Sequence, residues 1–267
     1  MNTLIMIGTR FKTAPIIPIS AQLQINTEVL LDYIVRIPQP KRDLTSPPRM
    51  ALIRSFDVNK PGAELKSLKG GVVGGTLLHG VLRIGDVLEI RPGIIVRDPD
   101  TSVIRHYTPL RTRVVSLFAE QNALTVAVPG GLIGVGTTLD PSLCRGDRIA
   151  GHVLGLLGTL PPVFLAIEIK YKLLSRVLGA HQDQQHTETV ITPLQKKEHL
   201  MLHVGCMCTG AEVVAVKTDK RRAKLLLSNP VCANEKDCIA ISRRIGSRWR
   251  LIGCGSIVRG TPLATSE

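Results

Sequence analysis

The fold class is decided by the stretch Leu165-Ala166-Ile167-Glu168-Ile169-Lys170-Tyr171-Lys172. Its period of two residues places every odd-numbered side chain toward a core and every even-numbered one on the opposite face. Such alternation predicts a half-buried β-strand rather than a helix. Further strand-like runs follow at Leu200–Val204, Val213–Lys217, Lys224–Leu227, Cys238–Arg243 and Leu251–Val258. Many short strands at even spacing predict a barrel or sandwich in this half of the chain.

A second strand-rich region extends from Arg49 to about Gly158, where Gly and Pro turns divide short apolar runs. Leu88 and Ile90 alternate with Glu89 and Arg91, as on a half-buried strand. Glycines are dense at positions 70, 71, 74, 75, 80 and 85. In a β-rich context they indicate bulges, barrel corners or places where another backbone approaches closely.

The first part of the chain has a different pattern. Ile16, Ile17 and Ile19 resemble a buried strand, and Thr27–Arg36 has the apolar spacing of an amphipathic helix with Asn26 as its N-cap. A Pro-rich, charged linker follows. We therefore expect a mainly β fold, with two consecutive β-barrels after a short α/β remnant. The expected boundaries are 1–43 for the remnant, 44–158 for the first barrel and 159–267 for the second.

The chain is strongly basic. Its 34 Lys and Arg residues exceed its 21 Asp and Glu residues, which gives a formal net charge of +13. This excess favours a polyanionic partner such as nucleic acid, because neutralised phosphates release condensed counterions. The alternative is that the charge only keeps the chain soluble. Aromatic residues make up 3% of the chain, which argues against binding single strands by base stacking.

Cysteine spacing gives no metal signature. The six cysteines form no C-x-x-C pair, and Cys206 and Cys208 fall in an apolar run where we expect buried, reduced thiols. We therefore expect no metal site. No signal peptide opens the chain and no run of about 18 apolar residues could span a bilayer. A cytoplasmic protein without membrane contact is expected.

Motifs for chemistry are absent from the sequence. A P-loop requires Gly followed directly by Lys, and this pair never occurs. The string Asn59-Lys60-Pro61-Gly62 begins like a guanine-recognition motif, but Gly62 replaces the carboxylate that would bind the base. No Ser/His/Asp or Cys/His arrangement is indicated. We therefore expect no catalytic residue in this chain.

Two basic clusters are the stronger signal. Lys217–Lys224 lies between two strand-like runs and is expected at the tip of a hairpin. Arg243, Arg244, Arg248 and Arg250 surround the only Trp, Trp249, which we expect in the core. Either cluster could be solvated charge on turns or a surface that contacts RNA phosphates.

Several long strings resemble the gamma subunit of eukaryotic and archaeal translation initiation factor 2. They include residues 54–62 (Arg54 to Gly62), 68–75 (Leu68 to Gly75), 89–94, 116–120 and 129–136 in the first barrel. In the second barrel, Ser242-Arg243-Arg244 and Trp249-Arg250-Leu251-Ile252-Gly253 are similar to the last domain of that family. The resemblance extends from about Ala14 to Thr261.

The resemblance implies an arrangement like that of elongation factor Tu, in which a GTPase domain that uses GTP and magnesium precedes two β-barrels. The family delivers initiator methionyl-tRNA to the small ribosomal subunit, and its first barrel receives the alpha subunit and helps hold the tRNA end. Lys69, Gly70, Gly71 and Val72 are then expected to contact that end, because glycines permit close approach. Phosphate contacts are expected at Arg243, Arg244, Arg248 and Arg250. Guanine-nucleotide contact is implied for Ser20, Ala21 and Gln22.

The sequence also departs from the family. Everything before the last strand of the GTPase domain is missing, so we expect no GTP hydrolysis by this chain alone and no binding of the beta subunit. Cys254 replaces a customary Trp, which would cost roughly 3–5 kcal/mol if it left a core cavity. Four interpretations stay open: a gamma-like chain without a nucleotide core, a non-functional or regulatory competitor for the alpha subunit, the C-terminal part of a longer active GTPase, and a generic basic RNA-binding barrel protein.

Overall fold

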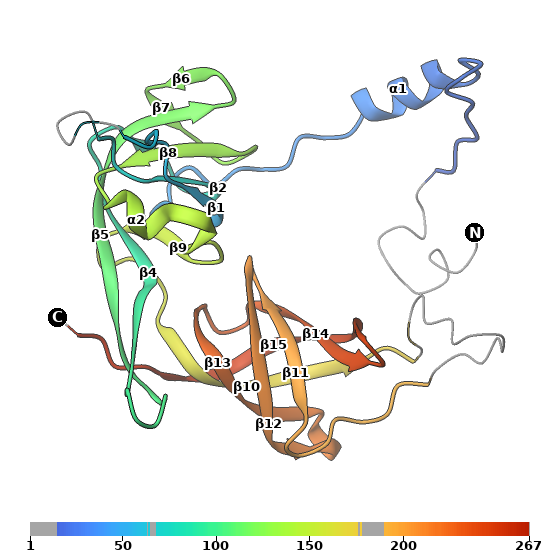
Figure 1. Cartoon of the computed structure of the whole chain (residues 1–267). Coiled ribbons are helices and arrows are strands. Elements are labelled where there is room, and N and C mark those ends of the chain that lie inside the picture. The colour runs from blue at the N-terminus through green and yellow to red at the C-terminus, as the bar shows by residue number, and fades with distance from the viewer. Residues whose placement is uncertain (1–14, 63, 65–67, 176, 178–189, 267) are drawn as a thin grey trace. The chain divides into compact units, whose positions relative to one another are not determined.

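The computed structural model describes residues 15–62, 64, 68–175, 177 and 190–266 (Figure 1). The chain divides into two compact units, Met1–Lys41 and Arg42–Glu267. In the described residues of the first unit, helix α1 spans Thr27–Val35, which confirms the expected helix. None of its residues is buried. Asn26 precedes it as expected, but its side chain donates to the Pro18 carbonyl instead of capping the helix.

The strand expected at residues 16–19 was wrong. These residues form no strand, and Ile16 and Ile19 are 59% and 45% exposed. A strand requires a neighbour that takes up its backbone hydrogen bonds. Among the described residues of this unit the only such pairing is an isolated bridge between Ser20 and Ile25. The apolar run therefore has the composition of a strand without its partner.

The first barrel is closed by six strands. Strands β4, β9, β1, β2, β8 and β5 are hydrogen-bonded in that order, and β4 also pairs with β5; β6 extends beyond β5, while β3 and β7 form a separate pair. The bounds are β1 Arg49–Phe56, β2 Val72–His79, β3 Leu82–Arg83, β4 Val87–Arg97, β5 Ile104–Ala119, β6 Asn122–Leu124, β7 Val126–Ala127, β8 Ile133–Thr137, α2 Pro141–Cys144, η4 Arg145–Asp147 and β9 Val153–Leu156.

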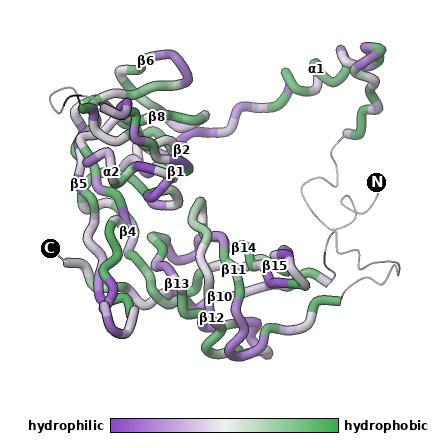
Figure 2. The backbone as a smooth tube through the Cα atoms, viewed as in Figure 1, coloured by the Kyte–Doolittle hydropathy of each residue, from purple (hydrophilic) through white to green (hydrophobic). Residues whose placement is uncertain are grey.

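The core of this barrel is built from the inward residues of these strands, with Met50, Leu52, Leu88 and Ile90 fully buried. Hydrophobic and hydrophilic stretches both occur along the barrel, as the colour of the tube shows (Figure 2). Gly75 is required where β1 and β2 approach, since a Cβ there would lie 1.9 Å from the Ala51 carbonyl oxygen. This confirms that the glycine-rich segment serves close backbone approach.

The second barrel is also closed, with the strand order β10, β13, β12, β11, β14 and β15. Strand β10 contains the stretch that predicted the fold, and it pairs with both β13 and β15. The bounds are β10 Val163–Leu173, β11 His199–Val204, β12 Met207–Lys217, η5 Thr218–Lys220, β13 Arg222–Cys232, β14 Cys238–Ile245 and β15 Arg248–Pro262. Each expected strand is present, and the basic cluster Lys217–Lys224 lies at the β12–β13 hairpin as predicted.

Hydrogen bonds of Arg91 and Glu89 hold the connection between the barrels. Arg91 on β4 donates from Nη1 to the carbonyl oxygens of Leu160 and Pro161, at 2.9 and 3.1 Å. Its Nε donates to Glu89 Oε1 at 2.8 Å, and Glu89 Oε2 accepts from the Gly158 backbone at 3.0 Å. Glu89 is only 3% exposed, and a buried carboxylate needs compensation of its charge. Arg91 and the backbone N–H of Gly158 provide it.

Leu202→Ala tests the core of the second barrel. Leu202 is 0% exposed, so the substitution should cost about 2–5 kcal/mol of stability. The control Leu226→Ala removes a side chain on the same barrel that is 43% exposed, and should cost about 0.5 kcal/mol or less. Urea unfolding followed by the fluorescence of Trp249 on β15 measures both. Equal shifts of the two midpoints would contradict the inward orientation of Leu202.

Candidate functional site

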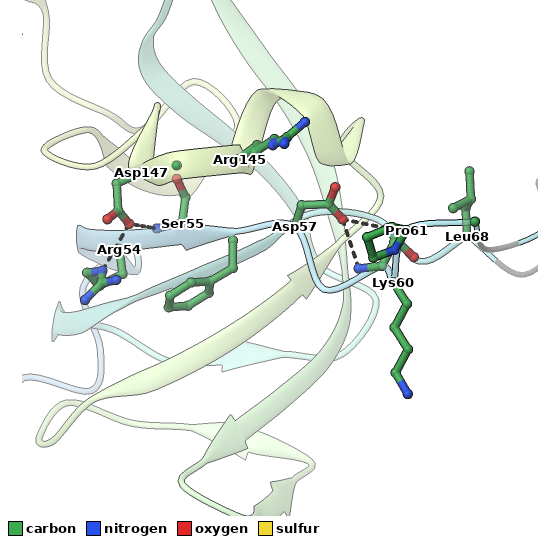
Figure 3. A pocket seen from close by; sticks show the side chains of 12 residues that line it. Arg54, Ser55, Asp57, Lys60, Pro61, Leu68, Arg145 and Asp147 are labelled. Carbon is green, nitrogen blue, oxygen red and sulfur yellow. Dashed lines mark hydrogen bonds and ion pairs between the residues drawn. The ribbon is translucent and has the colours of Figure 1, made fainter.

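A pocket of about 590 Å³ opens on the first barrel (Figure 3). Its walls are the end of β1, the turn that follows it, Leu68, and the turn Arg145–Asp147 after helix α2. Asp140 caps α2 by accepting the Ser142 backbone N–H at 2.8 Å, which positions the start of that turn. The pocket thus joins segments that are about 90 residues apart in the sequence, as the contact between Arg54 and Asp147 illustrates.

Asp147 connects the two walls. Its Oδ1 accepts the Ser55 backbone N–H at 2.8 Å and Arg54 Nε at 3.1 Å, and Figure 3 shows both contacts. The backbone hydrogen bond from Ser55, and then Arg54, lower the pKa of the Asp147 carboxyl. The Arg54 guanidinium lies over the Phe56 ring, with Cζ 5.5 Å from its centroid. Asp147 therefore remains ionised at neutral pH and orients Arg54 beside an aromatic ring that is 38% exposed.

The segment expected to contact a tRNA end is tied to this pocket. Asn59 Nδ2 donates to the Lys69 carbonyl at 2.8 Å, and Asn59 Oδ1 accepts the Lys69 backbone N–H at 2.8 Å. Asp57 Oδ1 accepts from Asn59 Nδ2 at 2.9 Å. The string that begins like a guanine-recognition motif therefore has a structural role, since Asn59 fixes Lys69 next to the pocket.

The pocket has an excess of positive charge. Figure 3 shows the side chains of Lys60 and Arg145 extending from two different walls. Both are exposed, and within the described residues neither side chain takes part in a hydrogen bond or ion pair. The carboxylates of Asp57 and Asp147 are already engaged by donors. Two uncompensated cations at the rim of a polar pocket suit a phosphate-bearing ligand.

Gly70 and Gly71 are explained by packing within the protein. A Cβ on Gly70 would lie 1.9 Å from the Thr137 carbonyl oxygen, and one on Gly71 would lie 2.3 Å from Cys144 Sγ. Val72 begins β2 and pairs with Phe56 and Gly136. Of the four expected contact residues, exposed Lys69 therefore offers a side chain beside the pocket, whereas the two glycines fit the chain against its own barrel.

The four arginines of the second cluster all lie on the β14–β15 hairpin but have different environments. Arg243 is held by Glu198, at 2.5 Å from its Nε, and by the Thr192 carbonyl at 3.0 Å from its Nη1. In the described part of the chain, the side chains of Arg244, Arg248 and Arg250 have no hydrogen-bond or ion-pair partner. Arg243 therefore has a structural role, Arg244 and Arg248 supply exposed charge, and Arg250 is half-buried.

Trp249 does not lie in the core, so that expectation was wrong. It is 44% exposed and pairs across the hairpin with Arg244. Counting by twos from buried Ile257 would bring Trp249 inside. A register shift places Ile241 opposite Gly253 but Ser242 opposite Leu251, which inserts an extra residue on β15. This bulge reverses the faces, so Ile252 is buried and Trp249 faces outward.

The residues expected to contact guanine nucleotide form a small turn in the first unit. Ser20 bridges to Ile25, and its hydroxyl accepts the Leu23 backbone N–H at 3.3 Å. Ala21 and Gln22 are exposed. The sequence contains no Gly-Lys pair to surround phosphates, and the turn alone presents no group for magnesium. These residues by themselves do not fit a complete GTP site.

Comparison with known proteins identifies homologues of the chain. Residues 165–257 match the family model described as initiation factor eIF2 gamma, C terminal. The chain is 50% identical over 264 residues to the eukaryotic translation initiation factor 2 subunit 3 of Drosophila melanogaster. It is 52% identical over 257 residues to the subunit gamma of Schizosaccharomyces pombe. The chain is homologous to the C-terminal part of eIF2 gamma subunits.

The homology with eIF2 gamma subunits covers the C-terminal domains of these relatives. The alignments include 97% and 96% of this chain, but the chain spans only 55% and 56% of the two relatives. Elongation factor SelB of Methanococcus maripaludis has the same fold, with a TM-score of 0.64 and 19% identity over 92% of this chain and 50% of that one. The structure of SelB in complex with the GTP analogue GppNHp gives a TM-score of 0.68 and 20% identity. This match covers 95% of this chain and 53% of the SelB chain. The expected two-barrel fold is therefore confirmed.

Cys254, where the eIF2 gamma family was expected to have Trp, is exposed. It faces outward between Ala240 on β14 and Lys172 on β10. A smaller side chain at an outward position leaves no cavity in the core, so the expected cavity cost is wrong. Cys254 is three residues from buried Ile257, so the two-residue period of β15 places it on the outer face.

The remaining cysteines differ in whether they are buried or exposed. Cys206 and Cys208 were expected to be buried but are exposed, because Cys206 lies in the β11–β12 turn and Cys208 pairs with His203 on the outer face. Cys144 and Cys232 are buried. No group of three His, Cys, Asp or Glu residues in the described ranges is arranged to hold a metal ion. In those same ranges, no helix is long and apolar enough to cross a membrane.

Thiol labelling should separate the six cysteines of this eIF2 gamma homologue into two groups. In the native chain Cys206, Cys208, Cys238 and Cys254 should react with an alkylating reagent, whereas Cys144 and Cys232 react only after unfolding. Burial raises the pKa of Cys144 to about 11 and that of Cys232 to about 12. Raising the pH from about 7 to about 9 should therefore leave both protonated and unlabelled. Mass spectrometry of labelled peptides measures this, and early labelling of Cys144 would contradict it.

Proposed function

We propose that this chain supplies the two C-terminal barrels of an initiation factor 2 gamma activity. The first barrel holds the acceptor end of initiator methionyl-tRNA and receives the alpha subunit, for delivery to the small ribosomal subunit in the cytoplasm. The proposal rests on one observation above all: a positively charged pocket adjoins Lys69 in a barrel that is homologous to eIF2 gamma subunits. The domains have the boundaries 1–43, 44–158 and 159–267 in this proposal.

The pocket suits the end of a tRNA in three respects. Its volume of about 590 Å³ lies within the usual range for small-molecule sites and accommodates one terminal nucleotide. Lys60, Arg145 and Lys69 supply charge for phosphates. Phe56, with Arg54 over its ring, supplies an apolar surface for a base or for the methionyl group. The hydrogen bonds that Asn59 and Asp147 accept from backbone N–H groups hold these side chains in place before a ligand binds.

Nucleotide switching is assigned to a GTPase domain rather than to these barrels. Ser20, Ala21 and Gln22 would contact guanine only together with the phosphate- and magnesium-binding motifs of such a domain. The same applies to the beta subunit, which the GTPase domain would hold. A second candidate function is competition: barrels that bind the alpha subunit without a nucleotide core would sequester it. Supply of the GTPase domain by a longer chain is the alternative, and a longer product of the same gene would support it.

Removing charge from the pocket tests tRNA binding. The double variant Lys60→Ala/Arg145→Ala should weaken binding of initiator methionyl-tRNA and reduce the slope of log Kd against log salt by about two. The control Lys170→Ala/Lys172→Ala removes two exposed lysines from β10 of the second barrel and should leave the slope unchanged. Equal effects of the two double variants would favour the generic RNA-binding barrel instead.

Copurification with the alpha subunit at moderate salt tests the partner. A stoichiometric complex is expected. Leu52→Asp, which places a charge in the core of the first barrel, should abolish it, whereas Leu202→Asp in the second barrel should not. Circular dichroism establishes that the parent chain is folded. A folded parent chain that forms no complex would sink the assignment of the alpha subunit to the first barrel.

A further inference from the structure

The β14–β15 hairpin combines an exposed aromatic ring with unpaired positive charge. Trp249 is 44% exposed, and Leu251, the next outward residue on β15, is 46% exposed. Arg244 lies directly opposite Trp249, so the two side chains share one face of the hairpin. The bulge that turns Trp249 outward gives this surface an aromatic platform that the composition of the chain did not suggest.

The Trp249 ring is not covered by a cation of its own. In the described residues the one cation–ring contact is that of Arg54 with Phe56, in the first barrel. Arg244 therefore lies beside the Trp249 ring without stacking over it. An indole that is 44% exposed leaves part of its apolar surface available to a ligand.

The charged residues of this hairpin are all positive. From Cys238 to Pro262 the sequence contains five arginines (Arg243, Arg244, Arg248, Arg250 and Arg259) and no Asp or Glu. Arg243 is neutralised by Glu198, and Arg259 by Glu168 at 2.6 Å. Arg244, Arg248 and Arg250 remain without a carboxylate in the described ranges. Arg244 shares the face of Trp249, whereas Arg248 and Arg250, the strand neighbours of Trp249, point to the other face.

We propose that Trp249 stacks on an unpaired base of single-stranded RNA whose adjoining phosphate contacts Arg244. The proposal goes beyond the function proposed for the first barrel, and it adds a stacked base to the phosphate contact that the sequence predicted at this hairpin. A duplex could use only the arginines, because its bases are already stacked and lie inside the helix. An isolated base can cover the free indole face, and Arg244 on the same face is placed to meet the adjoining phosphate. Exposed ring and exposed charge together favour the single strand.

The intrinsic fluorescence of the chain provides a site-specific test. Trp249 is the only Trp among the 267 residues, so its emission reports this hairpin alone. The whole chain is titrated with an eight-nucleotide unpaired RNA, with duplex RNA of equal phosphate number, and with a polyglutamate peptide of equal charge. The single strand should quench the emission, and the duplex and the peptide should not. Equal quenching by the peptide would replace the base-stacking proposal with an acidic protein partner.

Substitutions separate stacking from charge. By anisotropy of the labelled single strand, Trp249→Ala should weaken binding about tenfold and Trp249→Phe about threefold or less. Trp249→Ala should leave duplex binding unchanged, whereas Arg244→Ala should weaken binding of both RNAs. The control Phe118→Ala removes an aromatic side chain of the first barrel that is 41% exposed, and should change neither affinity.

The proposal would also be overturned by unchanged emission of the parent chain at saturating single strand, or by single-strand affinity of Trp249→Ala equal to that of the parent. Circular dichroism monitors folding; if Trp249→Ala does not fold, the parent titration and Trp249→Phe still decide. A failure of the base-stacking proposal is distinguishable from a failure of the proposed tRNA-binding pocket. Lys60→Ala/Arg145→Ala should leave the Trp249 quenching by the short single strand intact, because those residues belong to the first barrel.

Discussion

Closure of the hydrogen-bonded ring is the constraint on which the second barrel depends. Strand β10 pairs with β13 on one side and β15 on the other, so no strand edge remains unpaired in this sheet. The closed ring encloses an apolar core that includes Ile167, Leu202 and Leu225. Since the interior is filled by these side chains, polar chemistry is confined to the outer face and the connecting turns. Every candidate contact in this barrel lies there.

The pocket of the first barrel depends on a different kind of contact. Its walls come from segments distant in sequence, and few apolar side chains join them. Asp147 and Asn59 instead hold the walls through backbone hydrogen bonds, which fix their positions more narrowly than apolar packing would. Lys60 and Arg145 are left exposed by this arrangement. The structural residues thus take the hydrogen bonds, and the exposed cations are available to a ligand.

The two basic features illustrate how one residue type serves opposite purposes. Arg243 completes the packing of the segment around Thr192 and Glu198, whereas Arg244, its neighbour, faces outward beside Trp249. Burial and partners decide which role applies. The comparison with eIF2 gamma relatives shows the homology of these barrels but does not distinguish the two arginines, since it concerns the whole hairpin.

The sequence by itself determined the strand content, the two barrels and the family resemblance, because the two-residue period and long motif strings are local properties. It also located the basic hairpins, and the contact expected at Lys69 stays a prediction. It misplaced Trp249, Cys208 and the strand at residues 16–19, which depend on non-local facts. A single bulge at Ile252 on β15 reverses which side chains face the core, and an apolar run becomes a strand only beside a partner. Only the tertiary structure decided these faces, because register is set by pairing between strands and not by the order of residues within one.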